Sequence, residues 1–243
     1  MQILSIGNSF SQDAQTYVHR MAKELFTVNL FIGGCSLELH YRNMLGDKKS
    51  YLLEVCGLRT GFNMSIKEAL LSRKWDVITL QQVSSASFRY ESYMPYIEEL
   101  AAYVRKCNPA AKLYLHETWG YESNTERIEK WGFRTMDEMS EKVFATYAKV
   151  AETIGADGII PSGHGLLALS HAQDKPVHRD GSHADFGIGR YMLGCVWYET
   201  LTGKPVTETE FSDFDVLVTP EETALVREVA HKTVTEFLQT QRG

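Results

Sequence analysis

Short apolar runs alternate along this chain with amphipathic stretches, and that alternation limits the folds open to it. The expected strands are Gln2 to Ile6, Thr27 to Ile32, Val77 to Leu80, Lys112 to Leu115 and Gly158 to Ile160. Between most of them, apolar residues recur at helical spacing. Because repeated strand–helix alternation forms a parallel sheet covered on both faces, the sequence predicts an α/β fold whose mostly parallel sheet has about five strands.

The expected helices follow these strands and also fill the C-terminal part of the chain. They are 14–25, Ser65 to Leu71, 93–104, Met136 to Ile154, Phe186 to Leu201 and Pro220 to Leu238. The segment from Cys35 to about Asn63 has weaker periodicity, so we expect an irregular excursion with a short helix there. We find no internal repeat or linker, and a chain of 243 residues suits a single domain, 1–243.

The composition argues against several classes of partner. The formal net charge is −6, so the chain offers no basic surface for nucleic acid or for anionic lipid. No apolar run is long enough to span a bilayer. The chain enters its first strand without a signal-peptide pattern, so we expect a soluble, cytoplasmic protein. An exported protein whose signal has been trimmed stays open.

The cysteines predict no disulfide framework and no metal centre. Cys35, Cys56, Cys107 and Cys195 are widely spaced and form no CxxC pair. We therefore interpret them as mostly buried thiols.

Polar or glycine-containing clusters stand at or just after the ends of four expected strands. They are Ser9, Gly33–Gly34, Gln81–Gln82 and His116–Glu117. Because the carboxyl ends of parallel strands meet at one edge of a sheet, and ligands bind there, we expect these clusters to converge.

Ser9 is the candidate nucleophile. It lies in a tight turn between the first strand and an amphipathic stretch, where its hydroxyl would be presented at the sheet edge. A serine hydroxyl needs a base to remove its proton before it can attack a carbonyl. The alternative is that Ser9 or Ser11 only caps the helix, since Ser9 and Gln12 also form a capping-box pattern.

Asp180 and His183 are the candidate support for that serine. At a spacing of three in a turn, the imidazole could face Ser9 while Asp180 accepts from its other nitrogen. One alternative is a surface turn whose Asp180 caps the next helix. Another is a metal site made of His178, Asp180, His183 and Asp185, although no second His/Cys cluster accompanies it.

An acyl-transfer site also needs donors for the developing oxyanion. The backbone N–H groups of Ser9 and of Gly34 or Gly33 are candidates. A side-chain amide, Gln82 or Gln81, would be a third, and strand alternation sends these two glutamines to opposite faces. Taken singly, these residues could equally be ordinary turn glycines and polar strand ends.

These blocks together resemble the SGNH (GDSL-type) hydrolases. Gly7-Asn8-Ser9-Phe10-Ser11, the glycine after the second strand, the amide after the third and Asp180-Gly181-Ser182-His183 follow that family's order over most of the chain. The resemblance implies a flavodoxin-like α/β/α fold and metal-free, cofactor-free ester hydrolysis. It makes Ser9 the nucleophile, His183 the base and Asp180 its orienting carboxylate. Ser9, Gly34 or Gly33, and a glutamine would form the oxyanion hole.

The chain departs from the family pattern in two blocks. Asn8 stands where the family commonly has Asp, and Leu80-Gln81-Gln82-Val83-Ser84 lacks the usual glycine and asparagine of the third block. A glutamine there is similar to acetyl esterases that act on carbohydrates, and the blocks together resemble a poorly characterised bacterial branch.

The sequence therefore predicts a serine esterase that removes short acyl groups, acetyl above all, from a small-molecule or oligosaccharide ester. The alternatives are a lipase or thioesterase with the same triad, and a catalytically inactive carbohydrate-binding module. Asn8, His40, His116 and Trp119 are candidate substrate contacts. A loop tryptophan can instead anchor its loop, His40 can form a surface pair with Arg42, and His116 and Glu117 can satisfy one another. The oligomeric state is left open.

Overall fold

The computed structural model describes residues 1–241, and over them it has one sheet of seven strands. The strands are β1 (Gln2–Gly7), β2 (Phe26–Phe31), β3 (Tyr51–Val55), β4 (Leu58–Met64), β5 (Val77–Leu80), β6 (Lys112–His116) and β7 (Gly158–Ile160). Their order across the sheet is β4-β3-β2-β1-β5-β6-β7. The neighbouring strands β2, β1, β5, β6 and β7 are parallel. Strands β3 and β4 form an antiparallel extension beyond β2.

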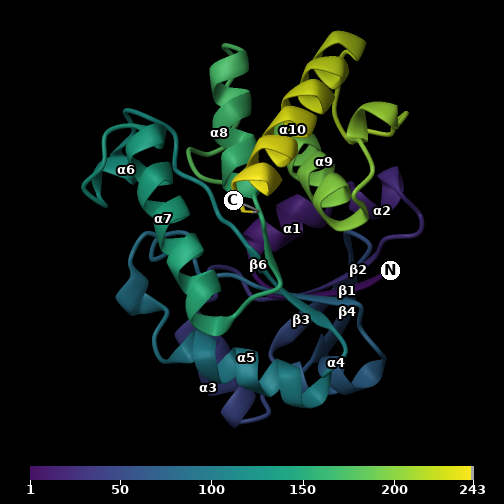
Figure 1. Cartoon of the computed structure of the whole chain (residues 1–243), viewed down its shortest axis with the longest axis vertical. Helices are drawn as coiled ribbons and strands as arrows, with labels where there is room; N and C mark the ends of the chain where they lie inside the picture. The colour runs from purple at the N-terminus through teal and green to yellow at the C-terminus, as the bar shows by residue number, and fades with distance from the viewer. Residues whose placement is uncertain (242–243) are drawn as a thin grey trace.

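Helices cover both faces of this sheet, which confirms the three-layer α/β/α class (Figure 1). They are α1 (Ser9–Gln15), α2 (Val18–Met21), α3 (Leu37–Leu45), α4 (Ile66–Ser72), α5 (Tyr96–Cys107), α6 (Glu126–Glu129), α7 (Met136–Ile154), α8 (Ser162–Ala172), α9 (Ile188–Thr202) and α10 (Pro220–Thr240). Figure 1 shows α1, α2, α8, α9 and α10 on one side and α3, α4 and α5 on the other. Helix α7 contacts β7, α5 and α8.

Local sequence explains where the helices begin. Three of them start with a capping box, in which Ser65, Thr135 or Thr219 accepts from the backbone of a glutamate three residues on, and that glutamate reaches back. The central strand β1 is almost entirely buried, which is why it reads as a continuous apolar run.

In the segment from Cys35 to about Asn63, α3 is the short helix that was expected, and the β3–β4 hairpin takes the place of the irregular part. Its turn at Cys56 and Gly57 has positive φ at both residues, the type I′ geometry that suits a two-residue hairpin. The sequence did not show this strand pattern, because Glu54 is an acidic residue at a buried position where alternation predicts an apolar side chain. Asn29 donates to Glu54 at 2.8 Å, so the buried carboxylate is stabilised by a strand that is distant in sequence.

Helix α8 was also not expected from the sequence. It contains Gly163 and Gly165, residues that ordinarily weaken a helix. A Cβ on Gly163 would come within 2.3 Å of the Thr118 carbonyl oxygen, and one on Gly165 within 2.8 Å of Val196 in α9. These glycines therefore allow α8 to approach the loop after β6 and α9 closely, and this tertiary packing outweighs helix propensity.

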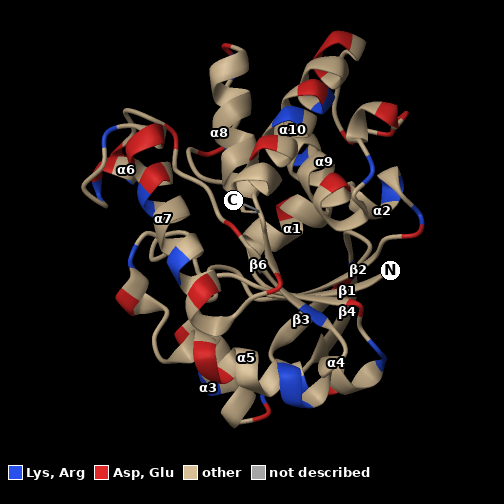
Figure 2. Cartoon of the chain, in the orientation of Figure 1, with Lys and Arg blue, Asp and Glu red and all other residues tan. Residues whose placement is uncertain are grey.

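Most charged residues lie on the outside of the fold, and Asp13, Glu54, Glu117 and Glu199 are buried exceptions. In the view of Figure 2, acidic and basic residues are mixed over the outer helices, and neither sign forms a continuous face. Helix α9 is the apolar centre of its layer, where it packs against α1, α8 and α10 with most of its side chains buried.

One buried carboxylate joins three segments near the carboxyl edge of the sheet. Asp13 of α1 has no solvent exposure, and it accepts from Arg179 at 2.9 Å and from Arg190 of α9 at 2.9 Å. Arg179 leads directly into the segment that contains His183. The ion pair therefore ties the helix that begins at Ser9 to the segment that carries the candidate base.

We expect Asp13→Ala to lower the free energy of unfolding by about 3–5 kcal/mol, because it leaves two largely buried guanidinium groups unpaired. Urea denaturation measures this loss. Arg42→Ala is the control, because it breaks the exposed Arg42–Glu38 pair and should cost less than about 1 kcal/mol. Equal losses in the two variants would contradict a structural role for Asp13.

Candidate active site

The turn from β1 into α1 presents Ser9 at the sheet edge. Asn8 is the N-cap of α1, and its side-chain oxygen accepts from the Phe10 backbone N–H at 3.0 Å. Ser9 is the first helical residue, so its own N–H has no partner within the helix. The capping role considered for Ser9 or Ser11 thus belongs to Asn8, and the Ser9 hydroxyl is left to another partner.

That partner is His183. The Ser9 Oγ lies 2.9 Å from the His183 Nε2, and the His183 Nδ1 lies 2.7 Å from an oxygen of Asp180. The other oxygen of Asp180 accepts from the backbone N–H of His183 at 2.9 Å and of Ser182 at 3.1 Å. The three residues that sequence analysis singled out are therefore joined in one hydrogen-bonded chain.

The electrostatics of this chain suit proton transfer. Partial burial by itself would raise the pKa of Asp180, but hydrogen bonds from the backbone and imidazole of His183 hold it well below its usual range. An ionised Asp180 accepts from the Nδ1–H of His183 and leaves Nε2 free to accept the Ser9 proton. The arrangement can thus generate a serine alkoxide during attack on a carbonyl.

The two backbone N–H groups expected to stabilise an oxyanion belong to Ser9 and Gly34. A turn from Ile32 to Cys35 follows β2, and Gly34 occupies its third position with φ +63°, a conformation that glycine adopts without strain. The Asn8 Nδ2 donates to the Cys35 carbonyl at 3.1 Å. Asn8 therefore links the turn that carries Ser9 to the turn that carries Gly34.

The structure gives both glutamines that were expected as a third donor other partners. Gln82 is buried, and its amide nitrogen donates to the carbonyl and hydroxyl oxygens of Ser92. Gln81 is also buried, and its amide nitrogen donates to the side-chain oxygen of Asn8 at 2.7 Å. The two glutamines do bond to opposite sides of the sheet, because Gln82 accepts from Leu37 at the start of α3. Each amide nitrogen thus has a partner within the protein, so the backbone N–H groups are the stronger candidates for oxyanion donors.

The expected substrate contacts are also corrected, because all four side chains are buried. His40 bonds to the Tyr51 hydroxyl at 2.9 Å, and His116 lies 2.8 Å from the side-chain oxygen of Gln81. Burial lowers the pKa of each of these histidines to about 3, so both are uncharged at neutral pH. Trp119 has no solvent exposure, and Asn8 is the N-cap described above. The burial of all four side chains argues against direct contact with a substrate.

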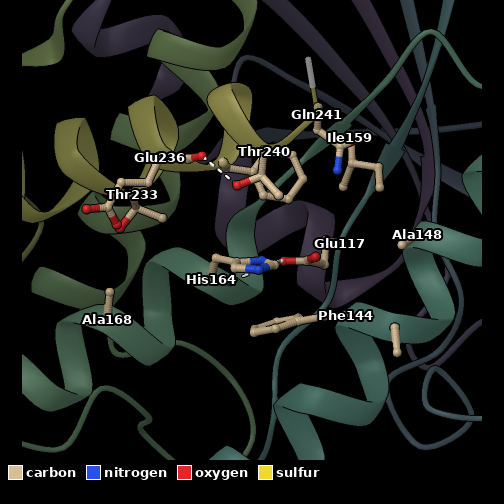
Figure 3. Close-up of a pocket in the computed structure, with 12 residues that line it drawn as sticks. Glu117, Phe144, Ala148, Ile159, His164, Ala168, Thr233, Glu236, Thr240 and Gln241 are labelled. Atoms are coloured by element: carbon tan, nitrogen blue, oxygen red, sulfur yellow. Dashed lines mark hydrogen bonds and ion pairs between the residues drawn. The ribbon is translucent and has the colours of Figure 1, made fainter. Parts of the chain in front are cut away.

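Glu117 has a different partner from the one expected. It accepts from the His164 Nδ1 at 2.9 Å and from the His164 backbone N–H at 3.1 Å, at the start of α8. This pair lines a cavity of about 420 Å³ between α7, α8 and α10, with Phe144 stacked on the imidazole (Figure 3). Neither Ser9 nor His183 lines this cavity, so it is separate from the triad.

The residues of the metal alternative are engaged elsewhere. His178 lies 3.1 Å from the Gly120 carbonyl, and Asp185 accepts from the Gly187 backbone. Within residues 1–241, no three His, Cys, Asp or Glu side chains group as metal ligands would. Over the same residues, no helix combines the length and apolar character that a membrane crossing needs. Cys35 and Cys195 are buried, whereas Cys56 and Cys107 are half-buried.

The contacts that hold the His183 segment in place were not predicted from the sequence. The loop between β6 and α7 reaches over it, where Arg127 donates to the Ser182 hydroxyl at 2.7 Å and the Glu122 N–H donates to the Gly181 carbonyl at 2.9 Å. The Ser182 hydroxyl in turn donates to Asp180 at 3.1 Å. No local pattern indicates these contacts, because the two segments lie more than fifty positions apart.

Solved structures share this fold. A candidate SGNH hydrolase from Slackia heliotrinireducens is 20% identical, with 83% of this chain and 98% of that chain covered and a TM-score of 0.63. A candidate GDSL-like lipase from Parabacteroides merdae is 15% identical, with 81% and 93% covered and a TM-score of 0.52. At these identities the likeness establishes the SGNH fold. No curated protein matches the chain.

Two comparisons are more specific. A crystal structure of a DUF4886 family protein from Bacteroides uniformis is 33% identical, covering 97% of this chain and 95% of that chain with a TM-score of 0.87. The family model described as "Domain of unknown function (DUF4886)" matches residues 2–233. With its SGNH-type fold, the chain therefore belongs to the DUF4886 family.

Proposed function

We propose that this protein is a serine ester hydrolase that removes short acyl groups, acetyl above all, and that a carbohydrate is the alcohol released. The observation that carries the proposal is the hydrogen-bonded chain from the Ser9 Oγ to the His183 Nε2 and from the His183 Nδ1 to Asp180. The fold alone does not require these three side chains to be aligned, which favours an active enzyme over the inactive binding module.

The reaction follows from this geometry. The Ser9 oxygen attacks the ester carbonyl while His183 takes its proton, and the Ser9 and Gly34 N–H groups stabilise the oxyanion. The tetrahedral intermediate collapses, and His183 returns the proton to the departing alcohol. A water molecule then attacks the acyl-enzyme with His183 again as base, and the carboxylic acid and free Ser9 are released.

The preference for a short acyl group rests on the space around Ser9. Neither Ser9 nor His183 lines any of five cavities of about 290 to 480 Å³ among the described residues. A lipase or thioesterase needs an apolar chamber beside its nucleophile for a long acyl chain. The proposal that the alcohol is a carbohydrate rests on the resemblance of the third block to acetyl esterases. The contacts of the two glutamines weaken that resemblance, so the identity of the alcohol is tested separately.

Ser9→Ala should abolish hydrolysis of p-nitrophenyl acetate and leave the fold intact. Loss of a triad member removes the nucleophile, and kcat should fall by about 10⁴- to 10⁶-fold. Steady-state kinetics measure the loss, and circular dichroism checks the fold. Ser170→Ala, in α8, is the matched control and should keep the parental rate. A Ser9→Ala enzyme with the parental rate would remove Ser9 from the mechanism.

His183→Ala should be about as damaging as Ser9→Ala, and the double variant little worse than either, because residues that act as one unit are not additive. Asp180→Asn should cost less, since the base persists in a poorer tautomer. The comparison needs kcat for all four variants under one set of conditions. Losses that simply multiply would show that Ser9 and His183 act independently, which contradicts the triad.

A substrate panel tests the acyl and alcohol parts separately. We expect kcat/KM to fall at least about tenfold from acetyl to octanoyl p-nitrophenyl esters, because none of the five cavities opens beside Ser9 to hold a longer chain. Acetylated sugars should be deacetylated faster than ethyl acetate when both are followed by acetate release. A preference for octanoyl esters would favour the lipase or thioesterase alternative. Equal rates on sugars and ethyl acetate would remove the carbohydrate from the proposal.

A further inference from the structure

Trp119 touches the immediate neighbours of both the candidate nucleophile and the candidate base. Its indole ring stacks on Phe10, with ring centroids 3.9 Å apart and planes 10° from parallel. Its indole N–H donates to the Ser182 carbonyl at 2.7 Å. Phe10 directly follows Ser9, and Ser182 directly precedes His183. One rigid, fully buried side chain from the loop after β6 thus bridges the two segments whose side chains must meet.

Phe10 also contacts the imidazole ring of His183. The edge of Phe10 meets the His183 ring, with centroids 5.6 Å apart and planes at 65°. Trp119, Phe10 and His183 are therefore packed in series beside the 2.9 Å contact from the Ser9 Oγ to the His183 Nε2. A displacement of either segment by about 1 Å would lengthen this contact beyond the range in which a proton is transferred efficiently.

We propose that Trp119 is a positioning residue that sets the separation of Ser9 and His183, through its stack on Phe10 and its hydrogen bond to the Ser182 carbonyl. This inference rests on the proposed function. It differs from the substrate-contact role expected from the sequence, because a side chain without solvent exposure cannot stack on a sugar. It also goes beyond core filling, because it predicts an effect on catalysis that exceeds the effect on stability.

Trp119→Phe is the informative substitution, because it keeps an aromatic ring for Phe10 and removes the indole N–H. The buried Ser182 carbonyl then loses its donor, and the His183 segment is free to shift toward another partner. Trp75→Phe is the matched control. Trp75 is also buried, and its indole N–H also donates to a backbone carbonyl, that of Ala69 at 3.0 Å. It stands just before β5, at the edge of the sheet opposite Ser9.

The experiment compares kcat and KM for p-nitrophenyl acetate with the rate at which a fluorophosphonate labels Ser9. In that labelling, the Ser9 oxygen bonds to phosphorus, fluoride leaves, and His183 accepts the proton. We expect Trp119→Phe to lower both kcat and the labelling rate by about 10- to 100-fold, with KM changed less than about threefold. Trp75→Phe should lose similar thermal stability and keep both rates.

The possible outcomes distinguish the proposed function from the positioning role of Trp119. A wild-type protein that neither hydrolyses the ester nor reacts with the fluorophosphonate would overturn the proposed function itself. An active wild type with equal rates in Trp119→Phe and Trp75→Phe would overturn the positioning role alone. If Trp119→Phe does not fold, NMR of the indole N–H groups in the wild-type protein tests the positioning role instead. The Trp119 signal should move when Ser9 is phosphonylated while that of Trp75 stays, and an unmoved Trp119 signal would contradict the proposal.

Discussion

The buried charge of Asp13 is the constraint on which the rest of the site depends. A carboxylate without solvent exposure is tolerated only when cations and hydrogen bonds compensate it, and here Arg179 and Arg190 do so. These three residues come from α1, from the segment that leads to His183, and from α9. Satisfying one charge thus fixes the relative position of the nucleophile helix and the base segment. Trp119 and Arg127 also hold the base segment, through their hydrogen bonds to Ser182.

The two departures from the SGNH pattern are bonded to each other. The amide of Gln81, in the altered third block, donates to the side-chain oxygen of Asn8, in the altered first block. The Asn8 amide then donates to the Cys35 carbonyl beside Gly34. An aspartate in place of Asn8 would have no N–H for Cys35 when ionised. The changes therefore form one amide network that links the turns carrying Ser9 and Gly34, the proposed oxyanion donors.

The sequence predicted the features that a local residue pattern encodes, and it did not predict those that depend on tertiary contacts. Strand positions followed from the apolar runs, and the place of Ser9 at the sheet edge followed from parallel topology, because strand ends share one edge. The pairing of Asp180 with His183 and their meeting with Ser9 rested on their spacing of three and on the family resemblance. The β3–β4 hairpin was missed because the burial of Glu54 depends on Asn29 of β2, and α8 because its glycines serve close packing. Alternation gave the faces of Gln81 and Gln82 correctly, but it carries no information on which partners their amides find. The burial of His40, His116 and Trp119 is likewise a tertiary property.

The central claim is that Ser9 becomes acylated, and trapping the acyl-enzyme tests it most directly. The protein would be mixed with p-nitrophenyl acetate, quenched in acid within milliseconds to seconds, digested and analysed by mass spectrometry. We expect one added acetyl group on the peptide that contains Ser9, appearing with the burst of nitrophenol and absent from Ser9→Ala. Hydrolysis without acetylated Ser9, or an equal acetyl label in Ser9→Ala, would contradict it.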